Sequence, residues 1–101
     1  MSRFLLQAEE ILETATAGAE DVAIVVDRLG GLRMLPPAGW SLHAMRLEFG
    51  AAAVYKVERR GSRVRVEGWN GEERCLLERP ALRPAGFAAT QPYMIRWAAG
   101  V

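Results

Sequence analysis

The chain has a single cysteine, Cys75, and a single histidine, His43, among its 101 residues. One cysteine cannot form an internal disulfide, which favours a reducing compartment. One histidine and one cysteine cannot supply the four nitrogen or sulfur ligands of a structural zinc site. A catalytic histidine needs a carboxylate to hold it and a nucleophile within reach, and the position of His43 beside a predicted helix cap indicates an ordinary surface residue. We therefore expect no enzyme activity.

Motifs for metals and cofactors are missing as well. Asp21 and Asp27 do not have the spacing of a calcium loop. Gly30 and Gly31 follow a β-rich run, but the glycine pattern and the lysine of a phosphate-binding loop are absent, so a hairpin turn is the simpler interpretation. The sequence predicts no metal and no cofactor.

Long apolar runs are also absent. No stretch approaches the ~20 apolar residues of a membrane span. Residues 1–11 include Glu9 and Glu10, which is unlike a secretory signal. A formal net charge of +1 gives no global attraction to nucleic acid or to an anionic membrane. We expect a cytoplasmic protein that does not contact membranes.

The composition that remains is typical of a globular domain. Half of the residues are hydrophobic and a quarter are charged. A length of 101 residues suits one domain with one core. We expect the core of the domain at residues 1–79, with residues 80–101 as a C-terminal extension that packs on it. Residues 90–99 fit a short helix and a strand almost equally well.

Two segments have helical signals. Ser2 is suited to cap a helix over residues 3–17, with Gly18 at its end. Ser41 is suited to cap a second helix over residues 42–49, which Gly50 would close. Both helices have an apolar face and therefore need a sheet or a partner to cover it.

Five segments have strand signals: residues 22–27, 32–35, 53–60, 63–69 and 72–79. The first is continuously apolar from Val22 to Val26 rather than alternating, which is typical of a central strand covered on both faces. The order is therefore α-β-β-α-β-β-β. We predict an α+β fold with an antiparallel sheet of about five strands and with the helices packed on one face.

The last three strands allow a register to be predicted. Two-residue turns at Gly61-Ser62 and Asn70-Gly71 would fix the pairing on both sides of the middle strand. Val66 would then lie opposite Val57 on one side and opposite Cys75 on the other. In this register four cross-strand pairs have opposite charges: Lys56 with Glu67, Glu58 with Arg65, Glu67 with Arg74, and Arg63 with Glu78. The apolar set, Tyr55, Val57, Val64, Val66, Cys75 and Leu77, shares one face, so we expect Cys75 to be buried.

The element order and two short phrases carry a resemblance. Residues 23–28 (AIVVDR), followed by glycines, and residues 64–68 (VRVEG) are similar to strands of the roadblock fold, found in small dimeric proteins that regulate GTPases. The second helix is about half the length that the roadblock fold uses. The resemblance implies a topology, and no functional residue is carried over from it.

The register leaves apolar side chains on the face opposite the core set. Trp69 and Val54 would lie side by side there, with Leu76 opposite Arg65 further along. Tryptophan and arginine are typical anchors of protein interfaces, so these four residues form the predicted partner contact. Two alternatives stay open: solvation by neighbouring Lys and Arg stems, or cover by the C-terminal residues Tyr93, Ile95 and Trp97.

A second candidate surface is basic. Arg59, Arg60 and Arg63 surround the Gly61-Ser62 turn and are the predicted contact for an anionic ligand. Pairing with nearby glutamates is the simpler interpretation, since aromatic residues for base stacking are scarce. We therefore expect a non-enzymatic protein-interaction module that binds a protein partner or itself, as a homodimer. The alternatives are a small nucleic-acid-binding domain that uses the arginine hairpin, which the charge balance disfavours, and a small-ligand sensor.

Overall fold

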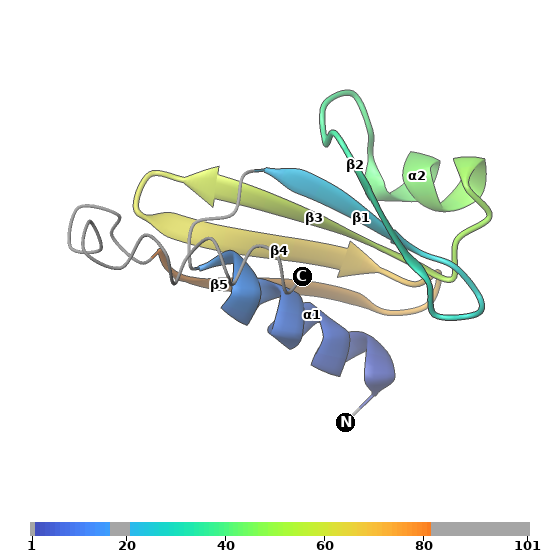
Figure 1. The fold of residues 1–101 in the computed structure, drawn as a ribbon, viewed down its shortest axis with the longest axis horizontal. Helices are drawn as coiled ribbons and strands as arrows, with labels where there is room; N and C mark the ends of the chain where they lie inside the picture. Colours follow the sequence, from blue (N-terminus) through green and yellow to red (C-terminus); the bar gives the residue numbers. More distant parts are fainter. Residues whose placement is uncertain (1, 17–20, 82–101) are drawn as a thin grey trace.

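The computed structural model describes residues 2–16 and 21–81 and confirms the predicted fold class. Its helices and strands follow in the order α1 (Arg3–Ala15), β1 (Val22–Val26), β2 (Leu32–Leu35), α2 (Leu42–Glu48), β3 (Ala53–Arg60), β4 (Arg63–Trp69) and β5 (Arg74–Pro80). The strands form one antiparallel sheet in the order β2-β1-β3-β4-β5 (Figure 1). In the part of the chain described, no helix is long and apolar enough to cross a membrane.

The helix α1 begins where its sequence predicts. The Ser2 hydroxyl accepts a hydrogen bond from the Leu5 N–H at 3.2 Å and so satisfies one of the free donors of the first turn. One face of the helix is buried on the sheet, through Phe4, Ala8, Leu12 and Ala15. The helix ends at Ala15, two residues before the expected end, and Gly18 lies outside the described residues.

The helix α2 also begins at its predicted cap. The Ser41 hydroxyl accepts a hydrogen bond from the Ala44 N–H at 3.0 Å. Leu42 and Met45 are buried on the sheet. Gly50, just after the helix, has a φ of 57°, a left-handed conformation that glycine adopts without steric cost.

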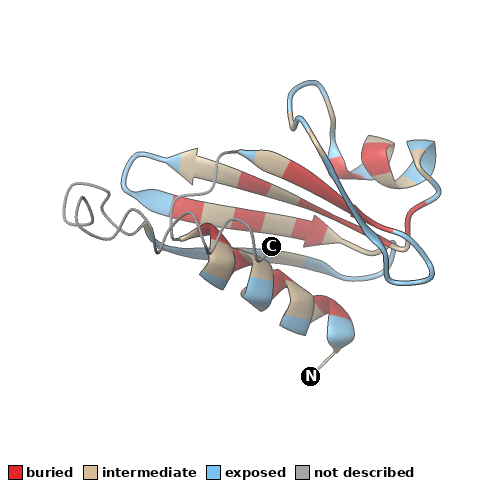
Figure 2. Ribbon diagram, viewed as in Figure 1, coloured by how far each residue is buried: buried red, intermediate tan, exposed pale blue. Residues whose placement is uncertain are grey.

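The two helices lie on opposite faces of the sheet, which differs from the expectation that both share one face. Side chains of a strand alternate between the two faces. Ile24 and Val26 of β1 belong to the core cluster under α1, whereas Ala23 and Val25 belong to the cluster under α2. The continuous apolar run of β1 is therefore buried on both sides, as its sequence indicated (Figure 2).

The register of the first predicted hairpin is confirmed. Val57 lies opposite Val66, Tyr55 opposite Gly68, and Lys56 opposite Glu67. The bounds of both strands also agree with the prediction. A two-residue turn with Gly61 at a φ of 61° joins them.

The register of the second hairpin is wrong by two residues. Val66 lies opposite Leu77 rather than Cys75, and Cys75 lies opposite Gly68. The connection has four residues, 70–73, because the Asn70 carboxamide oxygen accepts hydrogen bonds from the N–H groups of Glu72 and Glu73. A shift of two residues keeps each side chain on its predicted face, so Cys75 and Leu77 still pack toward the α1 core.

Candidate protein-interaction surface

The predicted contact at Trp69 and Val54 is largely covered by α2. Val54 has none of its surface exposed and belongs to the core cluster under α2, so it cannot contact a partner. Trp69 packs against the same cluster, and its ring is stacked with His43 at a centroid separation of 5.1 Å. The prediction of an open apolar surface at this position is therefore wrong. The prediction missed that α2 crosses to this face.

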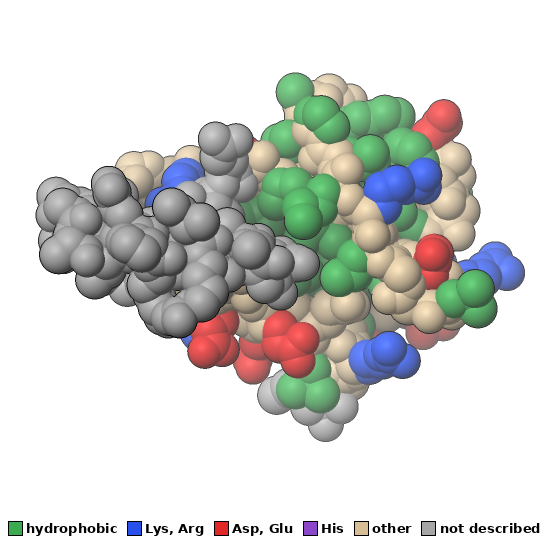
Figure 3. Space-filling model, viewed as in Figure 1, with side chains coloured by type: hydrophobic (Ala, Val, Ile, Leu, Met, Phe, Trp, Pro, Cys, Tyr) green, Lys and Arg blue, Asp and Glu red, His purple; other side chains and the backbone are tan. Residues whose placement is uncertain are grey.

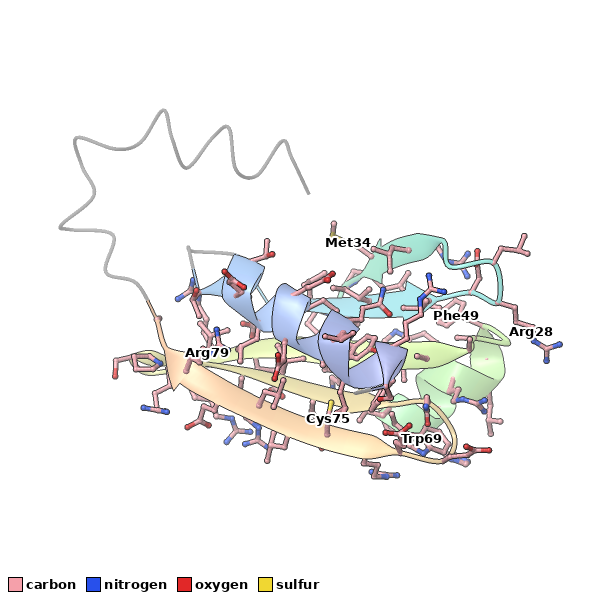
Figure 4. All side chains as sticks on the ribbon, turned by 90° about the horizontal axis from the view of Figure 1, so that it is seen from below. Arg28, Met34, Phe49, Trp69, Cys75 and Arg79 are labelled. Carbon is pink, nitrogen blue, oxygen red and sulfur yellow. The ribbon has the colours of Figure 1, made fainter. Side chains whose placement is uncertain are left out.

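Two arginines complete the packing around Trp69. The guanidinium of Arg46 lies 5.4 Å from the indole centroid and that of Arg74 lies 5.3 Å from it, which is cation–π distance. Arg46 comes from α2 and also lies close to Gly71 in the loop after β4. Trp69 thus packs between α2 and the end of the β4–β5 hairpin (Figure 4).

The other two residues of the predicted contact, Arg65 and Leu76, lie outside this packing. Leu76 is 58 % exposed, and its neighbour across the strand pair is Glu67. Arg65 lies beside Glu78 in the same way. One exposed leucine among alternating charges is an ordinary solvated surface.

Internal interactions hold two of the three hairpin arginines of the predicted anionic contact. The Arg59 guanidinium donates to the Ala15 carbonyl oxygen at 3.3 Å, at the end of α1, where a cation is favourable. Arg63 forms an ion pair with Glu78. Arg60 is exposed at the turn. Of the three arginines, Arg63 pairs with a glutamate, as the simpler interpretation expects, whereas Arg59 is held by a backbone carbonyl oxygen of α1.

A different apolar surface lies on the α1 face, at the edge of the sheet. It consists of Ile24 and Val26 on β1 and of Leu32 and Met34 on β2, and we call it the apolar strip. Leu32 lies opposite Val26 and Met34 lies opposite Ile24, so the four side chains share this face. Leu32 is 59 % exposed and Met34 is 56 % exposed.

Of the apolar strip, Ile24 and Val26 are buried, whereas Leu32 and Met34 on β2 are exposed because α1 lies to one side of β2. The helix packs on β3, β4 and β5, and leaves β2 uncovered within the ranges described. Figure 3 shows hydrophobic side chains gathered over this part of the molecule, and in Figure 4 Met34 lies at the outer edge, away from α1. The sequence prediction named no residue of β2 as functional, although the alternation Leu32-Arg33-Met34 places two apolar side chains on one face.

Beside β2 and the turn before it lies a hollow of about 280 Å³. Its lining comprises Val25, Asp27, Gly31, Leu32, Arg33 and Phe49. The Arg33 guanidinium lies over the Phe49 ring at 4.9 Å, and the Asp27 carboxylate accepts hydrogen bonds from the N–H groups of Leu29 and Gly31. Arg33 and Asp27 are thus engaged in contacts within the protein, and this leaves few polar groups in the hollow to bind a small ligand.

Cys75 is partly buried rather than fully buried, and it packs against the α1 core. Burial raises the pKa of its thiol above the ordinary value, and the carboxylates of Glu67 and Glu73 act in the same direction. A raised pKa keeps the thiol protonated at neutral pH and therefore a poor nucleophile. In the described ranges, no three His, Cys, Asp or Glu side chains cluster in a way that could hold a metal ion.

Comparisons with known proteins give no relative. No protein family matches the sequence, no curated protein is similar to it, and no solved structure matches the fold. The resemblance to the roadblock fold therefore gains no support from them, and the function must be argued from the surface itself.

Proposed function

We propose that this protein is a small non-enzymatic interaction module that associates with a second copy of itself through the apolar strip. The observation that carries the proposal is the exposure of Leu32 and Met34, both more than half exposed, side by side on one sheet face. Single exposed apolar side chains are common, whereas a contiguous pair on a strand at the sheet edge is typical of an interaction site.

The predicted alternatives have less support. Nucleic-acid binding through the arginine hairpin would have to break the contacts of Arg59 with α1 and of Arg63 with Glu78. A cytoplasmic location fits the single free cysteine, Cys75. Leu76 and Arg65, which the sequence predicted as part of the partner contact, provide a control for the apolar strip, because Leu76 is exposed to almost the same extent as Leu32.

The test is the dependence of molecular mass on protein concentration, by sedimentation or light scattering. The wild type should approach the mass of a dimer as concentration rises. Leu32→Ser combined with Met34→Ser should remain a monomer with a similar melting temperature, because both side chains are largely outside the core. Leu76→Ser, the matched control, should dimerise like the wild type.

Salt separates the apolar mechanism from a charge-driven one. Apolar association is maintained or strengthened at high salt, whereas binding through arginines weakens steeply. A wild type that stays monomeric at the highest soluble concentration would refute the proposal. A Leu76→Ser variant that loses the dimer while the double variant keeps it would move the contact to the other face.

A further inference from the structure

Among residues 2–16 and 21–81, no strand pairs with the outer edge of β2, so its outward backbone N–H and C=O groups have no strand partner there. The Asp27 N–H donates to the Gly31 carbonyl oxygen at 2.9 Å, which fixes the phase of the β1–β2 ladder. Inward and outward groups alternate along a strand of an antiparallel pair. Arg33 and Leu35 therefore direct their N–H and C=O groups toward β1, and Leu32 and Met34 direct theirs outward.

The two edges of the sheet differ in their protection. The β5 edge has Arg74, Glu78 and Arg79 along its length and ends at Pro80, features that natural proteins use to prevent edge pairing. The β2 edge has only one charged side chain, Arg33, and its first proline, Pro36, comes just after the strand. Of the two, β2 is the edge that another strand can join.

From these observations we infer that β2 pairs antiparallel with β2 of a second copy, about a two-fold axis at Arg33. This inference rests on the proposed function and adds the geometry of the contact. Leu32 then lies opposite Met34 of the second copy, and each of these residues uses its outward N–H and C=O groups in the new ladder. The apolar strips of the two copies join into one surface, because antiparallel pairing about this axis keeps the α1 faces on the same side.

Other symmetric registers use the edge less well. An axis at Met34 would place Leu32 opposite Pro36, which has no N–H to donate. An axis at Leu32 would place Met34 opposite Gly30, which lies in the turn with a φ of 88°. Of these three axes, only the one at Arg33 places the outward N–H and C=O groups of Leu32 in each copy opposite those of Met34 in the other copy.

The charges limit the strength of this pairing. The axis at Arg33 places the two Arg33 side chains opposite each other, and like charges in that position oppose pairing. The stacking of Arg33 on Phe49 of its own chain directs the guanidinium toward the α2 face of that copy. The strand has only four residues and the two arginines repel each other, so we expect a weak dimer in fast exchange. The surface area it buries should be far below the ~1,200 Å² that stable complexes bury.

Disulfide trapping tests the register. In a Cys75→Ser background, Arg33→Cys places one thiol on the axis in a pair whose Cα atoms lie about 4.5 Å apart, within the range of a disulfide. Mild oxidation should cross-link this variant into a dimer at least about tenfold faster than Met34→Cys or Leu35→Cys. Arg60→Cys, exposed at the far turn, is the control for random collision.

A charge variant gives a second measurement. Arg33→Glu mixed with the wild type should form the mixed dimer about two- to fivefold in excess of the statistical proportion, since opposite charges then face each other. A dimer by mass that cross-links through Met34→Cys as fast as through Arg33→Cys, or shows no preference for the mixed dimer, would overturn this geometry and leave self-association intact. A protein that is monomeric throughout would overturn both proposals.

Discussion

Replacing Gly68 with alanine tests how the α1 core is built. Gly68 has an ordinary φ, so its lack of a side chain is a matter of space rather than of backbone conformation. A Cβ atom at this position would lie 2.6 Å from Cδ1 and 2.8 Å from Cε1 of Tyr55, far inside van der Waals contact. The Tyr55 ring is fully buried and stacked on the Phe4 ring at a centroid separation of 5.3 Å, so it can move only by displacing its neighbours in the core.

The expected cost follows from two terms. Overpacking a well-filled core by one methyl group costs about 1–3 kcal/mol. Displacing the ring also strains or breaks the hydrogen bond from the Tyr55 hydroxyl to the Phe4 carbonyl oxygen, 2.9 Å long and worth about 1 kcal/mol. We therefore expect Gly68→Ala to lower the free energy of unfolding by about 2–4 kcal/mol. For a domain of this size that corresponds to a melting temperature lower by about 10–30 °C.

The assay is thermal and urea unfolding followed by circular dichroism. Gly39→Ala is the matched control, because nothing lies within 4 Å of a Cβ there and its cost comes only from a φ of +82°, about 1–2 kcal/mol. Tyr55→Leu in the Gly68→Ala background should be less destabilised than the sum of the single variants, since the smaller side chain makes room. A Gly68→Ala protein that melts with the wild type would refute the close packing of Tyr55 on β4.

Two further predictions concern the same core. Val66→Asp places a carboxylate at a fully buried position and should cost several kcal/mol of unfolding free energy, enough to unfold a domain of ordinary stability. Leu76→Asp, on the exposed face, should melt within a few degrees of the wild type. Equal melting temperatures of the two variants would contradict the face assignment. Burial raises the pKa of the Tyr55 hydroxyl well above its ordinary value of 10.0 and raises that of Cys75. The stability from these groups is therefore complete below their unfolded-state pKa values and is lost as the pH rises toward the folded-state values. Unfolding free energies from pH 8 to about 11 should fall for the wild type and fall less for Tyr55→Phe combined with Cys75→Ser.

Local signals in the sequence were sufficient for most of the secondary structure. Ser2 and Ser41 cap their helices as predicted, because a serine hydroxyl before an apolar helical pattern needs only neighbouring N–H groups to act on. The β3–β4 register followed from the turn at Gly61 and from the charge pairs beside it. These features depend on residues close together in the chain.

The position of α2 depends on long-range packing that the sequence does not display. The sequence places Val54 and Trp69 on the face opposite Tyr55, as the structure does, but it also predicts that this face is open. The structure closes it with Leu42 and Met45 of α2. Once α2 is placed there, the residual apolar surface moves to β2, whose four residues carry too short a pattern to be singled out without the helices in place.

The β4–β5 connection shows how a side chain can overrule a turn motif. Asn70-Gly71 suited a two-residue turn, but the Asn70 carboxamide oxygen instead binds the N–H groups of Glu72 and Glu73, at 2.9 and 2.6 Å, and the Asn70 N–H donates to the Glu73 carbonyl oxygen. These bonds hold a four-residue loop, and they move the register by two without exposing the apolar face.

Asn70→Ala removes both side-chain hydrogen bonds of this loop and should cost about 1–2 kcal/mol of unfolding free energy. Asn70→Asp keeps an acceptor oxygen and should retain most of the stability. Comparison of the two variants therefore distinguishes the loss of the acceptor oxygen from a general effect of substitution in the loop. The register has its own measurement: cross-strand nuclear Overhauser contacts should link Gly68 with Cys75 and Val66 with Leu77. Contacts between Val66 and Cys75 as direct partners in the wild type would restore the two-residue turn and refute the four-residue loop.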